Sequence, residues 1–292
     1  MYKSLNEHLR ERFGTKVYKI ALSSGCTCPN RDGTVGVGGC IFCADTGSGD
    51  FAQRAELPIK DQIKLAKEKI ASKNRGGKYI AYFQSFTNTY GSAEYLEPKF
   101  MEALADEEVV ALSIATRPDC LPEDILSMLE RLNKMKPVWV ELGLQTIHER
   151  TAAYIRRGYD LEVYDKAVGN LHAIGVEVIT HVIIGLPGET REDMLATVQY
   201  VVDSKAEGIK LQLLHVIEGT DLAKDYKAGI FNTLTMDEYI QMIKECVAMI
   251  PETMVIHRLT GDGNKKTLIA PLWSADKKRV LNALNEVLCA EN

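Results

Sequence analysis

Apolar runs alternate with amphipathic segments along most of the chain. Continuous apolar runs predict strands at 16–22, 79–83, 109–114, 138–142, 176–184 and 209–216. Apolar residues at helical spacing predict helices at 59–72, 98–104, 122–133, 161–174 and 191–202. The pattern therefore predicts about six β-then-α units, with parallel strands joined by right-handed crossovers.

The chain continues with a predicted helix at 236–249, a short strand at 255–259 and a final helix at 276–288. Six βα units can form either an open doubly wound sheet or an incomplete barrel, and periodicity does not choose between them. In both architectures ligands bind at the carboxyl ends of the strands. Functional side chains are therefore expected in the loops that follow the strands.

Composition sets limits on location and on partners. The 292 residues carry a formal net charge of -5, which argues against holding nucleic acid by bulk charge but allows a local basic patch. No apolar run approaches the roughly 20 residues that span a bilayer, and residues 1–7 lack the charge order of a secretion signal. We expect a cytoplasmic protein with no membrane association.

The cysteines point to metal or redox chemistry. Four of the seven lie between positions 26 and 43, and in a reducing compartment such crowding is not typical of disulfides. Cys40 and Cys43 form a C-x-x-C pair, and Cys28 lies upstream on a glycine-rich loop. Three thiolates suit a [4Fe–4S] cluster whose fourth iron stays open for a ligand. With Cys26 as a fourth thiolate, a closed structural zinc site is the alternative.

The segments 27–33 and 39–43 resemble the cluster loop of the YhcC/YtqA-type radical S-adenosylmethionine (SAM) proteins, which are relatives of the catalytic subunit of Elongator. The resemblance implies that Cys28, Cys40 and Cys43 bind a [4Fe–4S] cluster, that SAM is the second cofactor, and that Cys26 is a bystander. It also implies a partial (β/α)6 TIM-like barrel of the radical SAM type over residues 1–230. A short α/β C-terminal extension, residues 231–292, is expected to pack on that barrel.

Polar motifs follow four successive predicted strands, in the order that the family has. Arg117 offers a planar fork suited to a carboxylate, and Asp119 is predicted to cap the following helix. Glu141 on an apolar strand needs a partner, such as Arg117 or SAM. The cofactor-binding residues that the resemblance implies are Phe42, Gln84, Ser85, Asn88, Ser113, Arg117, Glu141, Gln145, Ile183, Gly185 and Gly188.

The substrate side has weaker candidates. The adjacent Arg156 and Arg157 can neutralise phosphate or hold a carboxylate, with a solvated surface pair as the alternative. His215 is placed on the last barrel strand, either facing the barrel mouth or packed in the core. The segment 257–263, with His257 and Arg258, has the composition of a ligand-facing loop.

The resemblance implies reductive cleavage of SAM to a 5′-deoxyadenosyl radical that abstracts hydrogen from an inert C–H bond. An electron donor such as flavodoxin or ferredoxin is the expected partner, and no residue is assigned to radical quenching. The expected substrate is tRNA, at the C5 substituent of the wobble uridine, for example conversion of carboxymethylaminomethyl to aminomethyl uridine. No acetyltransferase domain is expected. The alternatives are a radical SAM enzyme for a small metabolite, and a zinc-stabilised RNA- or partner-binding protein without catalysis.

Overall fold

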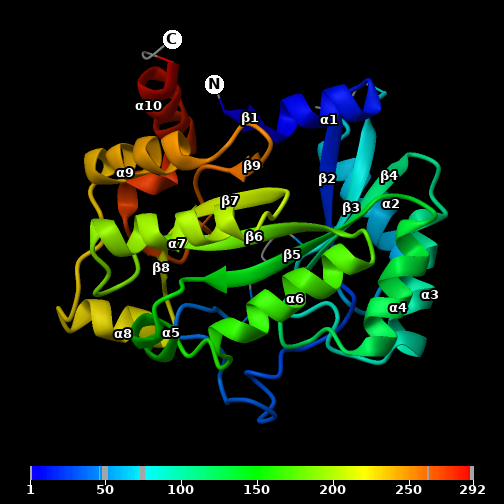
Figure 1. Ribbon diagram of the computed structural model, residues 1–292, viewed down its shortest axis with the longest axis horizontal. Coiled ribbons are helices and arrows are strands. Elements are labelled where there is room, and N and C mark those ends of the chain that lie inside the picture. The colour runs from blue at the N-terminus through cyan, green and yellow to red at the C-terminus, as the bar shows by residue number, and fades with distance from the viewer. Residues whose placement is uncertain (1, 46, 48–51, 73–75, 262, 290–292) are drawn as a thin grey trace.

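The computed structural model describes residues 2–45, 47, 52–72, 76–261 and 263–289. Its main sheet has eight parallel strands in the order β1-β9-β7-β6-β5-β4-β3-β2 and curls into an open half-barrel (Figure 1). The strands are β1 Lys3–Ser4, β2 Val17–Leu22, β3 Lys78–Phe83, β4 Val109–Thr116, β5 Val138–Gln145, β6 Glu177–Ile184, β7 Gly208–Leu213 and β9 Val255–Arg258. Strands β2 to β7 neighbour one another in chain order, without the reversal that defines a doubly wound sheet. The predicted partial barrel is confirmed.

Helices cover the outer face of this sheet, where their apolar stripes meet the outward-facing residues of the strands. The helices that follow the strands of the barrel are α2 Ile59–Ile70, α3 Ala93–Leu104, α4 Glu123–Asn133, α5 Glu149–Tyr154, α6 Leu161–Ala173, α7 Arg191–Asp203 and α8 Asp221–Lys227. Both termini lie at the end of the barrel opposite the long loop after β2 (Figure 1). Among the described residues, no helix is long and apolar enough to span a bilayer.

The C-terminal part of the chain joins the central sheet through β9. Strand β9 pairs with β7 on one side and with β1 on the other, through Gly208↔Val255 and Lys3↔Val255. Helices α9 Met236–Met249 and α10 Lys277–Cys289 complete this part of the chain. A short strand β10, Leu268–Ala270, also returns to pair antiparallel with β8, Val216–Ile217. The C-terminal residues therefore build part of the barrel wall.

Several local predictions differ from the structure, and three of the differences have a clear physical reason. Helix α3 begins at Ala93, five residues before the predicted start, because Ser92 caps it by accepting from Tyr95 N, and Pro98 is tolerated inside it. The strand predicted at 209–216 stops at Leu213 and β8 starts a separate ribbon, so His215 lies between two strands. Helix α1, Leu5–Phe13, was not predicted because it buries only Leu9 and its apolar pattern is faint.

We predict that Ile256→Ala lowers the free energy of unfolding by about 2–5 kcal/mol, the usual cost of emptying a packed site. Ile256 is 3% exposed in β9, whereas Ile230 is 65% exposed. Ile230→Ala is the matched control and should change stability by no more than about 0.5 kcal/mol. Urea denaturation measures both. Equal effects would mean that β9 is not an integral strand of the sheet.

Candidate active site

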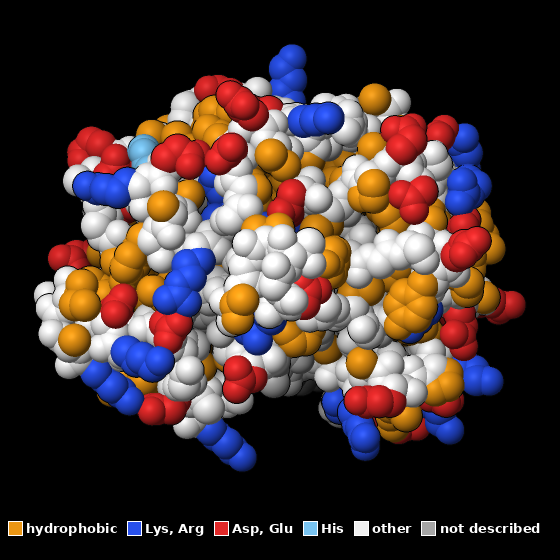
Figure 2. All heavy atoms as spheres, turned by 90° about the horizontal axis from the view of Figure 1, so that it is seen from below, with side chains coloured by type: hydrophobic (Ala, Val, Ile, Leu, Met, Phe, Trp, Pro, Cys, Tyr) orange, Lys and Arg blue, Asp and Glu red, His pale blue; other side chains and the backbone are white. Residues whose placement is uncertain are grey.

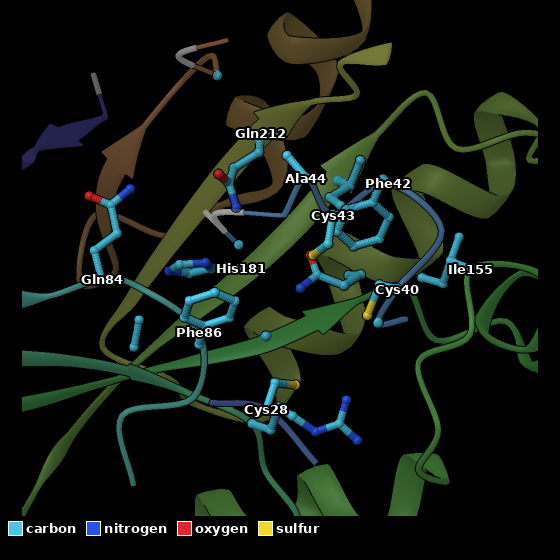
Figure 3. A pocket seen from close by; sticks show the side chains of 18 of the residues that line it. Cys28, Cys40, Phe42, Cys43, Ala44, Gln84, Phe86, Ile155, His181 and Gln212 are labelled. Atoms are coloured by element: carbon cyan, nitrogen blue, oxygen red, sulfur yellow. The ribbon is translucent and has the colours of Figure 1, made fainter. Parts of the chain in front are cut away.

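A cavity of about 300 Å³ opens at the carboxyl ends of the strands, between the loop after β2 and the C-terminal segment (Figure 3). All three predicted cluster cysteines line it. Six of the predicted cofactor residues also line it: Phe42, Gln84, Arg117, Glu141, Gln145 and Ile183. Of the substrate candidates, Arg157, His215 and Arg258 are in the wall. The strand-end motifs therefore converge on one cavity.

The cysteine loop is held in shape by its own backbone and by two polar side chains. Arg31 N donates to Cys28 O at 2.8 Å, and Cys43 N donates to Cys40 O at 2.9 Å. Cys28 and Cys40 therefore each begin a tight turn. Arg31 reaches back to the carbonyl oxygen of Cys43 at 3.3 Å, and its guanidinium lies over the Phe86 ring. Gly39 permits this approach, because a Cβ there would lie 2.9 Å from Arg31 Nε and its φ is +87°.

The thiols sit in an electropositive setting. The Cys43 thiol hydrogen-bonds to Cys40 and, with the nearby charge of Arg117 and the Asn30 amide, lowers the pKa of Cys40 to about 7. The same hydrogen bond raises the pKa of Cys43 well above its usual value. Asn30 Nδ2 lies 3.4 Å from Cys40 Sγ. The hydrogen bond and the nearby positive charges favour the thiolate of Cys40, the form that binds iron.

Cys26 lies elsewhere. Its side chain is buried in the hydrophobic core and does not line the cavity. Within the described part of the chain, no three Cys, His, Asp or Glu side chains gather closely enough to hold a single metal ion. A zinc site needs four ligands around one ion, whereas each thiolate of a [4Fe–4S] cluster binds a different iron. Three thiols, those of Cys28, Cys40 and Cys43, line one cavity, which is the number that a cluster with one open iron requires.

Gln145 is the residue most clearly prepared for a ligand. Its backbone has φ +70°, an unfavourable conformation for a residue other than glycine. Its buried Oε1 atom accepts no hydrogen bond from the protein. A buried acceptor left without a donor costs free energy, so a donor from a bound molecule is the natural complement.

Five predicted cofactor residues do not line the cavity. Asn88 is fully buried and its side chain is occupied, because it accepts from Ser24 Oγ and donates to the carbonyl oxygens of Phe83 and Ala115. Its role here is to tie together the ends of β3 and β4. Ser113 donates to Glu141 at the floor of the cavity. The other three, Ser85, Gly185 and Gly188, lie outside the lining.

Arg117 lines the cavity with its donors already engaged. Its Nε and Nη2 atoms donate to the two carboxylate oxygens of Asp119, at 2.8 and 2.7 Å, and Nη1 donates to Arg157 O. Asp119 therefore does not cap the next helix, whose N-cap is Pro122 without a side-chain bond. Arg117 also makes no contact with Glu141. Its Nε and Nη2 atoms donate instead to Asp119, which is two residues away in sequence.

The arginine pair divides between wall and surface. Arg157 is 2% exposed and donates to the carbonyl oxygens of Thr146 and Tyr159, so it supports the wall beside the cysteine loop. Arg156 does not line the cavity, and its exposed side chain pairs with Asp221 at 2.6 Å.

The two histidine candidates are also separated. His257 is partly buried against the Trp139 ring and does not line the cavity. His215 lies in the wall, 3.1 Å from Ser274 Oγ. In the predicted ligand-facing segment 257–263, residue 262 lies outside the described residues, and Arg258, Gly261 and Gly263 line the cavity.

Glu141 is the centre of a charged cluster at the floor of the cavity. It accepts from Lys19 at 2.6 Å, from His181 at 2.7 Å, and from Lys210. Burial by itself would raise the pKa of Glu141, but the two ammonium groups and the histidine hold it well below its usual value. The partner that sequence analysis required for this carboxylate is therefore a set of side chains from β2, β6 and β7.

His181, Lys210 and Gln212 were missed as cavity residues. Lys210 and Gln212 are two residues apart on β7, so both point to the same face of a strand whose other residues are largely apolar. His181 is a similar interruption in β6. The period-2 placement of polar residues in these runs was the signal that could have identified them.

Comparisons with known proteins agree with this geometry. Residues 25–201 match the model of the Radical SAM superfamily, and residues 206–289 match that of the Radical_SAM C-terminal domain. The chain belongs to the radical SAM superfamily. YtqA of Bacillus subtilis (strain 168) is 48% identical over 287 residues, covering 98% of this chain and 89% of that protein. The predicted resemblance to the YhcC/YtqA type is confirmed.

More distant similarities cover parts of other proteins. A tRNA uridine(34) acetyltransferase of Methanocaldococcus jannaschii is 31% identical over 170 residues, covering 57% of this chain and 31% of that protein. The solved structure of Methanocaldococcus infernus Elp3 has a TM-score of 0.66 and 21% identity, covering 87% of this chain and 58% of that chain. The similarity to the Elp3 structure supports the barrel fold of this chain.

Membership of the radical SAM superfamily makes a [4Fe–4S] cluster and SAM the cofactors of this chain. The residues present fit both. Cys28, Cys40 and Cys43 are the thiols of the cavity wall, and the open acceptor of Gln145 lies on the same cavity.

We predict that alanine at Cys28, Cys40 or Cys43 abolishes the cluster, because each thiolate holds an iron for which the wall offers no substitute. Cys26→Ala is the matched control and should retain iron. Iron and sulfide analysis, with absorption near about 400 nm on anaerobic protein, measures this. Loss of iron in Cys26→Ala with retention in Cys28→Ala would reverse the assignment.

We also predict that Gln145→Ala weakens SAM binding by about tenfold, the worth of one good hydrogen bond. Unfolding stability should stay within about 0.5 kcal/mol, because Oε1 has no protein donor to lose. Gln62→Ala is the contrasting control: the Gln62 amide is satisfied by Ser23 and Leu57, so its removal lowers stability. SAM titration and urea denaturation decide. Unchanged SAM affinity in Gln145→Ala would remove Gln145 from the cofactor site.

Proposed function

We propose that this radical SAM enzyme remodels the C5 substituent of the wobble uridine in tRNA, for example by converting carboxymethylaminomethyl to aminomethyl uridine. The observation that carries the proposal is the similarity to a tRNA uridine(34) acetyltransferase. The match to the Radical SAM superfamily, residues 25–201, includes the cysteine loop and strands β3 to β6, which build most of the cavity. A shared barrel supports a shared target base.

The cofactors supply the hydrogen-abstracting chemistry, and the protein supplies binding, orientation and exclusion of water. In this proposal the three thiols hold the cluster, and Gln84 and Gln145 provide polar contacts for SAM. Phe42, Phe86 and Ile183 give the cavity an apolar share of its wall, which keeps water away from a reactive site. An electron donor such as flavodoxin or ferredoxin completes the proposed system.

A modest RNA contact surface fits the charge of the protein. The face seen in Figure 2 has basic side chains interspersed with acidic ones. Of the arginines proposed for the substrate, Arg156 is exposed near the cavity, Arg258 lies inside it, and Arg157 is committed to the wall. Binding should therefore rest on few phosphates, with a shallow salt dependence, and on a flipped anticodon base that enters the cavity.

We predict that tRNA from a strain without this chain accumulates one wobble-uridine derivative and loses another. Comparative nucleoside analysis of bulk tRNA by mass spectrometry makes the measurement. Complementation with the natural chain should restore the profile, whereas the Cys43→Ala chain should not. An unchanged set of wobble-uridine derivatives would exclude tRNA and favour a small-metabolite substrate for the same radical SAM site.

A further inference from the structure

The interior of the barrel is charged at the floor of the cavity. Barrel interiors of this kind are usually filled by branched apolar side chains. Here Glu141, 1% exposed, is surrounded by Lys19, His181, Lys210 and Ser113, which come from four other strands. Removing these charged groups from water costs free energy. We therefore ask what function the charges serve in this cavity.

Positive charge exceeds negative charge in this cluster. A single carboxylate is shared by the ammonium groups of Lys19 and Lys210. His181 adds no positive charge at neutral pH, because burial and the nearby Lys210 lower its pKa to about 4. Arg258 lies close enough for its charge to act on Lys210. Among the described residues that contact Glu141, the cluster therefore has two lysines for one carboxylate.

The two lysines differ in their access to the cavity. Lys210 lines it, and Lys19 is not among the described residues that do. Lys210 donates to Glu141 and, at 3.3 Å, to Tyr82 Oη, and an ammonium group has three donors. Gln212 on the same face of β7 and Arg258, which is in register with Lys210 on β9, also line the cavity. The cavity floor thus presents several donors from neighbouring strands.

We propose that Lys210, with Arg258 and Gln212 beside it, binds a carboxylate on the substrate. The inference rests on the proposed function for the identity of that group: the carboxymethylaminomethyl substituent ends in a carboxylate. Backbone phosphates of an RNA stay outside when one base enters a cavity, so an anion at the floor must be carried by the substituent itself. Charge-assisted hydrogen bonds to a carboxylate are among the strongest that a protein makes.

The same floor discriminates against the product. Aminomethyl uridine carries a positive amine and no carboxylate, so it would meet an excess of positive charge without compensation. The state of Lys210 agrees with this: burial, Lys19 and Arg258 lower the pKa of Lys210 to about 7, against the opposing effect of Glu141. A bound carboxylate relieves that repulsion.

Two anticodon stem-loop RNAs test the proposal, one with carboxymethylaminomethyl uridine and one with aminomethyl uridine at the wobble position. Their phosphates are identical, so a difference in Kd reports the carboxylate. The cluster-loaded natural chain should prefer the first RNA by about tenfold or more. Lys210→Met should lose the preference. Lys19→Met is the matched control: Lys19 pairs with the same carboxylate but is not among the described lining residues, so this variant should keep more of the preference than Lys210→Met does.

If Lys210→Met does not fold, Lys210→Gln replaces it. Lys210→Gln should also lose the preference for the RNA with carboxymethylaminomethyl uridine. Equal binding of both RNAs by the natural chain, or a preserved preference in the Lys210 variants, would overturn the proposal. Loss of the preference in Lys19→Met to the same extent would also overturn it, because the effect would then belong to the whole cluster.

A small-molecule comparison separates this inference from the proposed function. If neither RNA binds, the tRNA assignment is wrong, and N-acetylglycine and N-acetylglycinamide are titrated instead, with binding followed by NMR. Binding of the acid but not of the amide, lost in Lys210→Met and kept in Lys19→Met, would support the carboxylate site alone. Absence of that difference would overturn the carboxylate site as well.

Discussion

The ion cluster around Glu141 is the interaction on which the barrel and its cavity depend. A buried carboxylate is tolerated only when charges and donors surround it, and here they come from β2, β4, β6 and β7, while Glu141 itself is on β5. One side chain therefore links five strands through contacts inside the barrel. Removing a partner from such a cluster typically costs about 3–5 kcal/mol, so the cluster constrains which substitutions the barrel accepts.

The cluster also divides the cavity into two chemically different sides. The cysteine loop provides three thiols, held by Asn30 and Arg31, on one side, and β6, β7 and β9 provide a cationic floor on the other. Figure 3 shows the cysteines and His181 around the same pocket. The first side belongs to the chemistry common to the radical SAM superfamily. The second side is where we place recognition of the substrate.

Sequence reasoning identified the parts that depend on local pattern. Periodicity located β2 to β7, and the C-x-x-C spacing with an upstream cysteine located the thiols. Side-chain direction at strand ends was less predictable, because it depends on loop conformation: Asn88 and Arg117 were both proposed for SAM. In the structure the Asn88 amide donates to backbone carbonyl oxygens, and the Arg117 guanidinium donates to the Asp119 carboxylate. The place of β9 between β7 and β1 rests on contacts between distant parts of the chain, which no local pattern contains.

We propose that a radical SAM reaction occurs on the C5 substituent of a wobble uridine in this cavity. The most direct measurement uses tRNA deuterated at the terminal methylene of the carboxymethylaminomethyl group and analyses the 5′-deoxyadenosine released during turnover by mass spectrometry. The account predicts that deuterium appears in 5′-deoxyadenosine, and that its amount depends on Lys210. Formation of 5′-deoxyadenosine without deuterium, in the presence of tRNA that binds and remains unchanged, would contradict it.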